Sequence, residues 1–338
     1  MATLTRAFKE LFQRTPDEQF ATLAELMKHC RAIRENSREH WLTHEQICIT
    51  SDMNVVLDGD PDYRFCDWSF SQLCQMAGVS RGTINRLSSK TASRALQETM
   101  PHSEKPFQLL TAESGIRSIH GVAYTRLWND ELLSAIAEAA PEFTAPQQAV
   151  DGSTGLYCGE QDMFAFLIDP QGWIEMNDQA FAPGFFVWNS EVGRRTVGVQ
   201  TFWFQKVCRN HIVWDAVEVM EVSRRHTAGV RDFTEIARRA VTDLVRKRDV
   251  RRDRLSQVLK RAMCEKLGSD AHDVSRQLRR HGIPSDLGKK AIEVAAQGNG
   301  FTVFSLVDAL TQLTQQSTFI GDRTALDMKV SSLLSLVV

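Results

Sequence analysis

The residues best suited to chemistry in this chain are cations packed along a few turns of one predicted helix. Six basic side chains fall within nine residues: Arg246, Lys247, Arg248, Arg251, Arg252 and Arg254. Contacts to a phosphate backbone need dense positive charge rather than a particular base, so this pattern suffices for them. The alternatives are a solvated helix balanced by its own Asp249 and Asp253, or a helix that docks on an acidic face of a neighbouring subunit.

These cations belong to a larger segregation of charge. Residues 224–290 hold 19 Lys/Arg against 9 Asp/Glu, whereas residues 1–223 hold 19 against 29, and the whole chain has a formal charge of −2. A basic stretch in an otherwise acidic protein indicates a site for polyanions, above all for nucleic acid.

A second candidate combines cations with aromatic residues on predicted strands. Four basic residues flank the aromatic run 202–204: Arg194, Arg195, Lys206 and Arg209. Strand alternation places Phe202 and Phe204 on one face and Trp203 on the other. Trp203 is therefore a candidate for stacking on a base. The competing interpretation is that these aromatics form the core of the sheet.

Residues 70–87 fit a helix-turn-helix. Gly78 supplies a turn residue that tolerates a positive φ, and apolar residues on both sides would hold the helices together. Five polar residues would then project from a recognition helix: Ser80, Arg81, Thr83, Asn85 and Arg86. Any two packed helices need the same apolar contacts, so the pattern favours the helix pair more than it favours DNA reading.

Enzyme signatures are largely missing, since the sequence has neither a phosphate-binding loop nor a dinucleotide fingerprint. Glu160, Asp162 and Asp169 could hold a metal ion for nuclease work, but their spacing does not show that they converge. We therefore predict no catalytic residue, no metal and no cofactor, and we favour a binding protein over an enzyme.

The elements that must position these residues follow from hydrophobic periodicity. Helices are expected over residues 2–36 and 67–100, with Thr15-Pro16-Asp17 as the start of the second part of the first helix. Strands are expected over 46–58 and 116–127, and a turn at 58–61 should end the first of these strands.

The second half of the chain divides into strands and then helices. Asn129 or Asp130 should cap a helix that runs to about Ala139, and residues 140–156 should form a linker or long loop. Residues 157–222 predict an antiparallel sheet. From Thr227 onward the pattern is helical.

The predicted fold class is α+β, with an antiparallel sheet core, flanking helices and a helical C-terminal region. The predicted parts are an N-terminal helical segment (1–45), an α+β core domain (46–226) and a helical, basic C-terminal region (227–338). The seven cysteines are scattered and favour free thiols in a reducing compartment. With no signal peptide and no apolar stretch of about 18 residues, we expect a cytoplasmic protein without a membrane partner.

The block from Val187 to Val213 resembles the phage/plasmid-like family catalogued as domain of unknown function 932. Its pattern is an Asn-Ser-Glu-x-Gly turn, a strand, and then Cys-x-Asn; the matching residues are Asn189, Ser190, Glu191, Gly193, Cys208 and Asn210. Residues 67–87, 116–133 and 301–316 are similar to other family segments, so the resemblance spans about residues 45–320. His211 stands where the family often has glycine.

The resemblance implies a mobile-element context and no established catalytic residue. In that context the basic region predicts a sequence-tolerant DNA-binding protein that acts in recombination, protection or maintenance, with a preference for single strands as one option. A homo-oligomer is expected. Alternatives are an interaction module that inhibits a host defence system, with a host protein as partner, and a metal-dependent nuclease.

Overall fold

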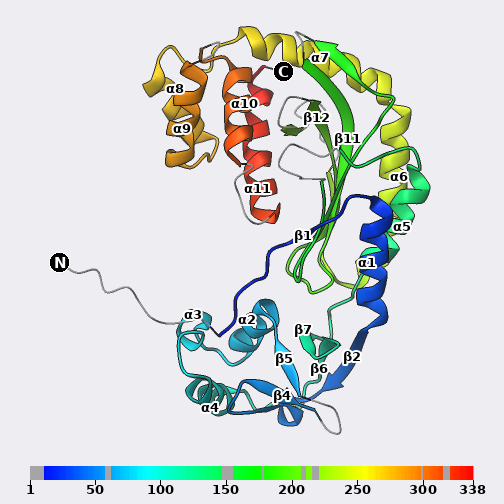
Figure 1. Cartoon of the computed structure of the whole chain (residues 1–338), viewed down its shortest axis with the longest axis vertical. Helices are drawn as coiled ribbons and strands as arrows, with labels where there is room; N and C mark the ends of the chain where they lie inside the picture. The colour runs from blue at the N-terminus through cyan, green and yellow to red at the C-terminus, as the bar shows by residue number, and fades with distance from the viewer. Residues whose placement is uncertain are drawn as a thin grey trace, which may run out of the picture.

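The computed structural model describes residues 11–57, 62–146, 155–176, 179–206, 211–214, 221–297, 300–314 and 320–337. They form two lobes, each built around its own β-sheet (Figure 1). The predicted α+β class is confirmed, because antiparallel pairing dominates both sheets, helices flank them and the C-terminal region is helical. None of the described helices is long and apolar enough to cross a bilayer.

The small lobe, residues 37–121, contains one sheet with the strand order β2-β6-β7-β5-β4-β3. Its strands are β2 (Ser37–Leu42), β3 (Cys48–Ile49), β4 (Asn54–Val56), β5 (Tyr63–Phe65), β6 (Phe107–Ala112) and β7 (Gly115–Gly121). All pairs are antiparallel except β5 with β7. The helices α2 (Asp67–Met76), α3 (Arg81–Ile84) and α4 (Ser89–Thr99) bury Phe70, Leu73 and Leu96 in the core of this lobe.

The large lobe contains the second sheet, with the order β1-β8-β9-β11-β12-β13. Its strands are β1 (Glu18–Gln19), β8 (Leu156–Cys158), β9 (Met163–Ile168), β10 (Ile174–Met176), β11 (Gln179–Asn189), β12 (Val197–Lys206), β13 (His211–Trp214) and β14 (Glu221–Arg224). β10 pairs with β11, and β14 pairs with β12. The predicted antiparallel sheet over 157–222 is thus present.

Residue alternation along β11 and β12 gives this sheet two apolar faces. Phe185 and Val199 lie on one face, where α1 (Leu23–Glu35), α5 (Asn129–Ala139) and α6 (Phe233–Arg246) cover them. Phe186, Phe202 and Phe204 lie on the other face in an aromatic cluster with residues of β8 and β9. The predicted separation of Phe202 and Phe204 from Trp203 is confirmed.

The remaining helices build a second apolar core at the far end of the large sheet. They are α7 (Arg248–Cys264), α8 (Ala271–Arg280), α9 (Ser285–Ala296), α10 (Val303–Thr314) and α11 (Ile320–Ser331). Leu259, Leu278 and Leu310 pack there with Phe181 and Trp203 of the sheet. Short 3-10 helices lie at His44–Gln46, Ala228–Val230 and Ser332–Val337.

The first helix begins later than the sequence predicted. Thr22 caps α1, because its hydroxyl accepts from the backbone N–H of Glu25 while the Glu25 carboxylate accepts from the backbone N–H of Thr22. This capping box is a stronger start signal than Thr15-Pro16-Asp17. Residues 15–22 are extended instead, and β1 pairs with β8.

Two strand predictions also need correction. The single strand expected over 46–58 is a hairpin of β3 and β4, in which Met53 adopts φ +65° and ends the turn. The strand β6 lies in a segment for which no strand was predicted, because Gln108 and Thr111 are buried on opposite sides of the strand and interrupt any alternation of polar and apolar residues. The predicted turn at 58–61 lies outside the described residues.

The structure divides the predicted core domain, 46–226, between the two lobes. The small sheet also takes up β2 from the predicted N-terminal segment. In the other direction, α6 belongs with the large sheet, because Phe233 and Val241 share one apolar cluster with Phe185 and Val199.

Gly184 is a position at which the large sheet can be tested. A Cβ there would lie 2.5 Å from the Leu167 carbonyl oxygen and 2.8 Å from the Phe202 ring. We therefore expect Gly184→Ala to lower the free energy of unfolding by about 1–3 kcal/mol, as overpacking of a core does. Urea denaturation measures this. Gly82→Ala is the control, since a Cβ at Gly82 meets no atom within 4 Å; an equal loss in both variants would contradict the packing.

Candidate nucleic-acid interface

The basic segment forms helices α6 and α7 on the outer side of the large lobe (Figure 1). The apolar stripe of α6, with Phe233, Val241 and Leu244, is buried on the sheet. Leu255 and Leu259 belong to the apolar stripe of α7, which is buried in the second core. Because the apolar stripes face inward, the described charged side chains of both helices point to solvent.

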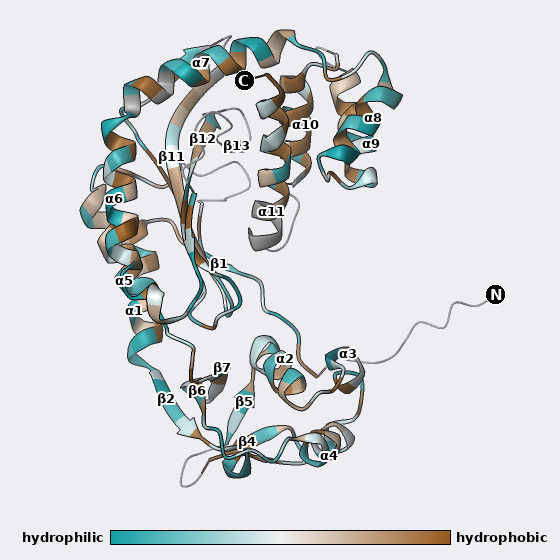
Figure 2. Cartoon of the chain, turned by 180° about the vertical axis from the view of Figure 1, so that it is seen from behind, coloured by the Kyte–Doolittle hydropathy of each residue, from teal (hydrophilic) through white to brown (hydrophobic). Residues whose placement is uncertain are grey.

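The described basic side chains of this region are exposed. They are Arg231, Arg238, Arg239, Arg246, Lys247, Arg254, Lys260, Arg261, Lys266, Arg276, Arg279, Arg280, Lys289 and Lys290. Figure 2 shows the corresponding hydrophilic residues, in teal, along α7, α8 and α9. Arg248, Arg251 and Arg252 lie in α7, but their side chains are outside the described part of the structure.

The basic residues predicted for the helices, within 246–254, are only part of the exposed basic surface. Exposed cations continue onto α8, with Arg276, Arg279 and Arg280, and onto α9, with Lys289 and Lys290. These five residues lie inside the basic stretch 224–290. The excess of Lys and Arg over that stretch therefore indicated them, whereas the search for the densest run of cations, 246–254, left them out. We call the exposed basic side of α6–α9 the basic rim.

Local ion pairs neutralise only part of the basic rim. Arg239 pairs with Glu235 at 3.1 Å, Arg246 with Asp243 at 3.6 Å, and Arg238 with Glu138 of α5 at 2.9 Å. Exposed pairs of this kind contribute at most about 1 kcal/mol, so a phosphate can replace the carboxylate. Several cations of the rim form no ion pair with a described residue, among them Lys247, Lys260, Arg261, Lys289 and Lys290.

Arg194 and Arg195, which precede β12, do not join the basic rim. Arg195 donates to Asp162 at 3.1 Å, and the guanidinium of Arg194 lies 5.2 Å from the centre of the Trp68 ring of α2. Both precede β12, whereas Lys206 ends that strand, eleven residues or about 36 Å further along the chain from Arg195. Arg194 and Arg195 therefore do not lie in one cluster with Lys206. Arg209 lies outside the described residues.

Trp203 is not a base-stacking platform in this structure. Its side chain is 1 % exposed and packs with Phe181, Leu255 and Val258 in the second core. The prediction failed because α7 covers the face of the sheet that alternation had left open. The competing interpretation of the aromatic run, as core, is the one that the structure supports.

The predicted helix-turn-helix forms a helix pair without a recognition helix. Gly78 adopts φ +67° in the turn as expected, but α3 has one turn only and Arg81 is engaged by Asp67. The Asn85 side chain is buried and bonds to the backbone of Phe12 at 2.8 Å in both directions. Neither residue can read a base from this position.

The same stretch spells Gly-x-Ser-x-Gly, from Gly78 to Gly82. In α/β hydrolases that motif turns from a strand into a helix and exposes the serine as a nucleophile. Here Ser80 stands between two helices, as the N-cap residue of α3. The context therefore differs from that of a nucleophile.

The carboxylates proposed for nuclease work do not converge. Asp162 is buried and paired with Arg195 and with Arg14, the latter at 3.6 Å. Asp169 is buried at the other end of β9, where it accepts from the backbone N–H of Gln171. Among the described residues, no three His, Cys, Asp or Glu side chains are placed to hold a metal ion.

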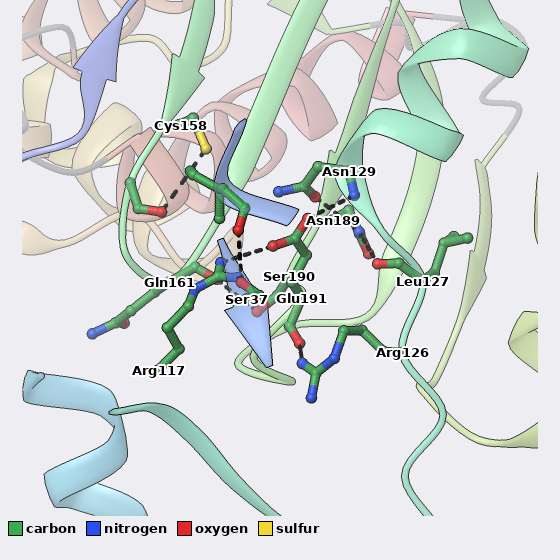
Figure 3. Close-up of polar contacts among 12 residues, drawn as sticks. Ser37, Arg117, Arg126, Leu127, Asn129, Cys158, Gln161, Asn189, Ser190 and Glu191 are labelled. Carbon is green, nitrogen blue, oxygen red and sulfur yellow. Dashed lines mark hydrogen bonds and ion pairs between the residues drawn. The ribbon is translucent and has the colours of Figure 1, made fainter. Parts of the chain in front are cut away.

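The Asn-Ser-Glu-x-Gly segment forms a buried turn where the two lobes meet (Figure 3). The Glu191 carboxylate accepts from Arg117 of β7 at 2.7 Å and from the backbone N–H of Asn129, the first residue of α5, at 2.8 Å. The Asn189 amide donates to the Leu127 carbonyl at 2.8 Å and to the Asn129 side chain at 2.9 Å. One short segment thus fixes β7, α5 and β11 to each other.

The rest of this turn is held equally closely. The Ser190 hydroxyl donates to the Gln161 carbonyl at 2.6 Å, and the Tyr124 hydroxyl donates to the Glu191 carbonyl at 2.7 Å. Gly193 adopts φ +71°, and a Cβ there would lie 2.9 Å from the Tyr124 ring. These contacts explain the glycine and the polar residues of the motif as structural requirements.

Tyr124 is sandwiched by two histidines beside this turn. Its ring stacks on His120 at 3.6 Å and lies 5.5 Å from His226. Burial lowers the pKa of His226 to about 4, and burial together with the Arg126 charge lowers the pKa of His120 to about 3. Both rings are therefore neutral near pH 7.

Comparison with protein-family models, with curated proteins and with solved structures gives no match to this chain. The resemblance to domain of unknown function 932 therefore stays a prediction from the residues quoted for it. Any functional proposal depends on the geometry of the chain itself.

Glu191→Gln tests the buried turn. The amide keeps the shape of the side chain but removes the charge that pairs with Arg117, so we expect the free energy of unfolding to fall by about 3 kcal/mol. Urea denaturation measures the loss. Glu98→Gln, which breaks an exposed pair with Arg94, is the matched control and should change stability far less, because solvent screens that pair. Equal effects would show that Glu191 does not join the lobes.

The histidine stack predicts a pH dependence. A histidine has a pKa of about 6.5 in an unfolded chain, so below that pH the unfolded chain takes up protons that folded His226 does not. Stability is then fully present above about pH 6.5 and is lost as pH falls toward 4. Between pH 7.5 and 4.5 the loss should be about 2 kcal/mol smaller in His226→Gln than in the wild type. Urea denaturation at each pH tests this, with exposed His272→Gln as control; parallel wild-type and His226→Gln profiles would contradict it.

Proposed function

We propose that the chain binds nucleic acid through its phosphates along the basic rim of α6–α9, with little dependence on base sequence. The observation that carries this proposal is that the described Lys and Arg side chains of residues 231–290 are exposed rather than turned into the core. A line of exposed cations across successive helices matches a polyanion better than it matches a small ligand.

The composition of the rim supports phosphate contacts over base contacts. Residues 234–300 contain no Phe, Trp or Tyr, and Trp203 is covered by α7. The rim therefore has no aromatic ring on which bases could stack, and stacking is the main source of preference for single strands. Binding through phosphates alone is sequence-tolerant and depends strongly on salt.

The family resemblance extends the proposal toward a biological role. It supports DNA as the polymer and a phage or plasmid context, with recombination, end protection or maintenance as the process, and we propose that the protein acts there as a homo-oligomer. These extensions depend on the resemblance and not on the basic rim. The rim alone supports the binding of phosphate backbones.

The test removes charge from the rim without touching the core. The rim variant replaces four exposed residues by glutamine: Arg246, Lys247, Arg254 and Arg261. We expect its affinity for a fluorescent DNA 30-mer to fall by about a hundredfold near 0.15 M salt, and the slope of log K against log salt to flatten by about three, because each phosphate contact contributes 0.7–0.9 to the slope. Fluorescence anisotropy measures both.

The matched control removes the same charge elsewhere. It replaces four exposed basic residues of the small lobe by glutamine: Arg64, Arg86, Lys90 and Lys105. This variant should lose less than tenfold in affinity, and circular dichroism should show both variants folded. Equal losses in the two variants would place binding elsewhere than the rim. If neither the variants nor the wild type binds DNA, but the wild type binds a host protein through α6–α9, the rim is a protein-docking surface instead.

A further inference from the structure

A cavity of about 450 Å³ opens between the two lobes, beside α1. Its walls come from the chain before α1, from α1 itself, from the β6–β7 turn and from the end of β8. His29, Arg117, Cys158 and Glu160 all line it. All residues that line the cavity precede the basic stretch 224–290 in the chain. The proposed nucleic-acid binding therefore does not account for the cavity.

Two cysteine thiols meet at the inner end of this cavity. Cys158, at the end of β8, is 2 % exposed and lines the cavity, whereas Cys30 of α1 is fully buried and does not line it. The two thiols lie in one buried cluster, close enough to shift each other's pKa, and both are free; the Cys158 thiol also donates to the Gly159 carbonyl at 3.9 Å. A reagent that enters the cavity can therefore reach Cys158 first and Cys30 only through Cys158.

The surroundings favour a thiolate on Cys158. The hydrogen bond from the Cys30 thiol is the largest cause that lowers the pKa of Cys158, and a hydrogen bond from His29 lowers it further, against burial and the charge of Glu191. The same hydrogen bond raises the pKa of Cys30, which stays protonated as the donor. A thiolate is the reactive form of cysteine.

His29 lines the same cavity as Cys158 and is placed to act as its proton donor. Its hydrogen bond to Cys158 is the largest cause that raises the pKa of His29, and the charge of Glu18 acts in the same direction. Burial and the charge of Arg117 oppose this rise. A histidine in this position can give a proton to a leaving group in the cavity.

We propose that Cys158 and Cys30 are a redox-active thiol pair, in which Cys158 reacts with a small hydroperoxide in the cavity and Cys30 then closes a reversible disulfide with it. The pair, the cavity and the adjacent histidine are three independent features of one place in the fold. A nearby second thiol is what converts an oxidised cysteine into a disulfide instead of an irreversible acid.

The two steps balance with a hydroperoxide as the oxidant. The Cys158 thiolate attacks one peroxide oxygen and the O–O bond breaks, which gives a sulfenic acid and an alkoxide or hydroxide that takes the proton of His29. Cys30 then attacks the sulfenic sulfur, an S–S bond forms, and the sulfenic oxygen leaves as water with the Cys30 proton. The thiols lose two electrons, the peroxide gains two, and a dithiol reductant reverses the change.

The first experiment uses the whole reduced chain and one equivalent of hydrogen peroxide. The chain has seven cysteines, so the number of thiols titrated in denaturant should fall by two, and mass spectrometry of tryptic peptides should find Cys30 joined to Cys158. Dithiothreitol should restore the thiols. A chain in which exposed Cys48 and Cys264 are oxidised while Cys30 and Cys158 stay reduced would overturn the proposal.

Variants separate the role of Cys158, which reacts with the peroxide, from that of Cys30, which closes the disulfide. Cys30→Ser should stop at the sulfenic acid, trapped by dimedone on Cys158, and Cys158→Ser should prevent oxidation of Cys30. The control is Cys264→Ser, which should behave as the wild type. Disulfide formation at an unchanged rate in His29→Gln would exclude the histidine from the mechanism.

A second measurement serves if the serine variants do not fold, since both cysteines are in the core. Alkylation of reduced wild-type protein by iodoacetamide, followed peptide by peptide against pH, should show Cys158 reacting with a midpoint below the value of about 8.5 of an ordinary thiol. His29→Gln should move that midpoint upward. A midpoint at or above 8.5 in the wild type would contradict an activated thiolate.

Discussion

The buried carboxylate of Glu191 joins parts of the chain that two separate sheets would otherwise leave apart. It accepts from Arg117 of the small sheet and from the first backbone N–H of α5, while its own carbonyl accepts from Tyr124. A buried charge is costly unless each oxygen has a donor, so the strands and helices that supply these donors must be in place together. The motif around Glu191 is thus a requirement of the fold before it is anything else.

The basic rim depends on this junction through packing. Asn129 begins α5, α5 packs on α6, and Arg238 of α6 pairs with Glu138 of α5. The inner stripe of α6 and α7 is used entirely by the sheet and the second core, which leaves the charged stripe to solvent. The cavity with Cys158 adjoins the same junction, because Arg117, which pairs with Glu191, also lines the cavity. The junction around Glu191 therefore positions both the basic rim and the cavity.

Local patterns were predicted well from the sequence. The positive φ of Gly78, the end of α5 at Ala139 and the alternation of Phe202 and Trp203 each depend on neighbouring residues in the chain. The predicted cap of α5 was wrong, because its N-cap is Trp128 and not Asn129 or Asp130. The charge count over 224–290 predicted an exposed basic region because charged side chains are rarely buried without partners.

Long-range pairings could not be predicted in this way. Whether Trp203 is open or covered depends on α7, which follows about fifty residues later. The contact of Cys30 with Cys158, and that of Glu191 with Arg117, join residues that no spacing rule relates. The capping box of Thr22 and Glu25 was within reach of the sequence, but Pro16 had suggested an earlier start.

The central claim is that nucleic acid lies along the basic rim of α6–α9, and cross-linking maps this most directly. The wild-type protein would be bound to a photoreactive DNA 30-mer at moderate salt, irradiated and digested, and the cross-linked peptides identified by mass spectrometry. We expect cross-links within residues 231–290 that disappear with excess unlabelled DNA of any sequence. Cross-links confined to residues 11–121, or none at all under conditions where binding is saturated, would contradict the claim.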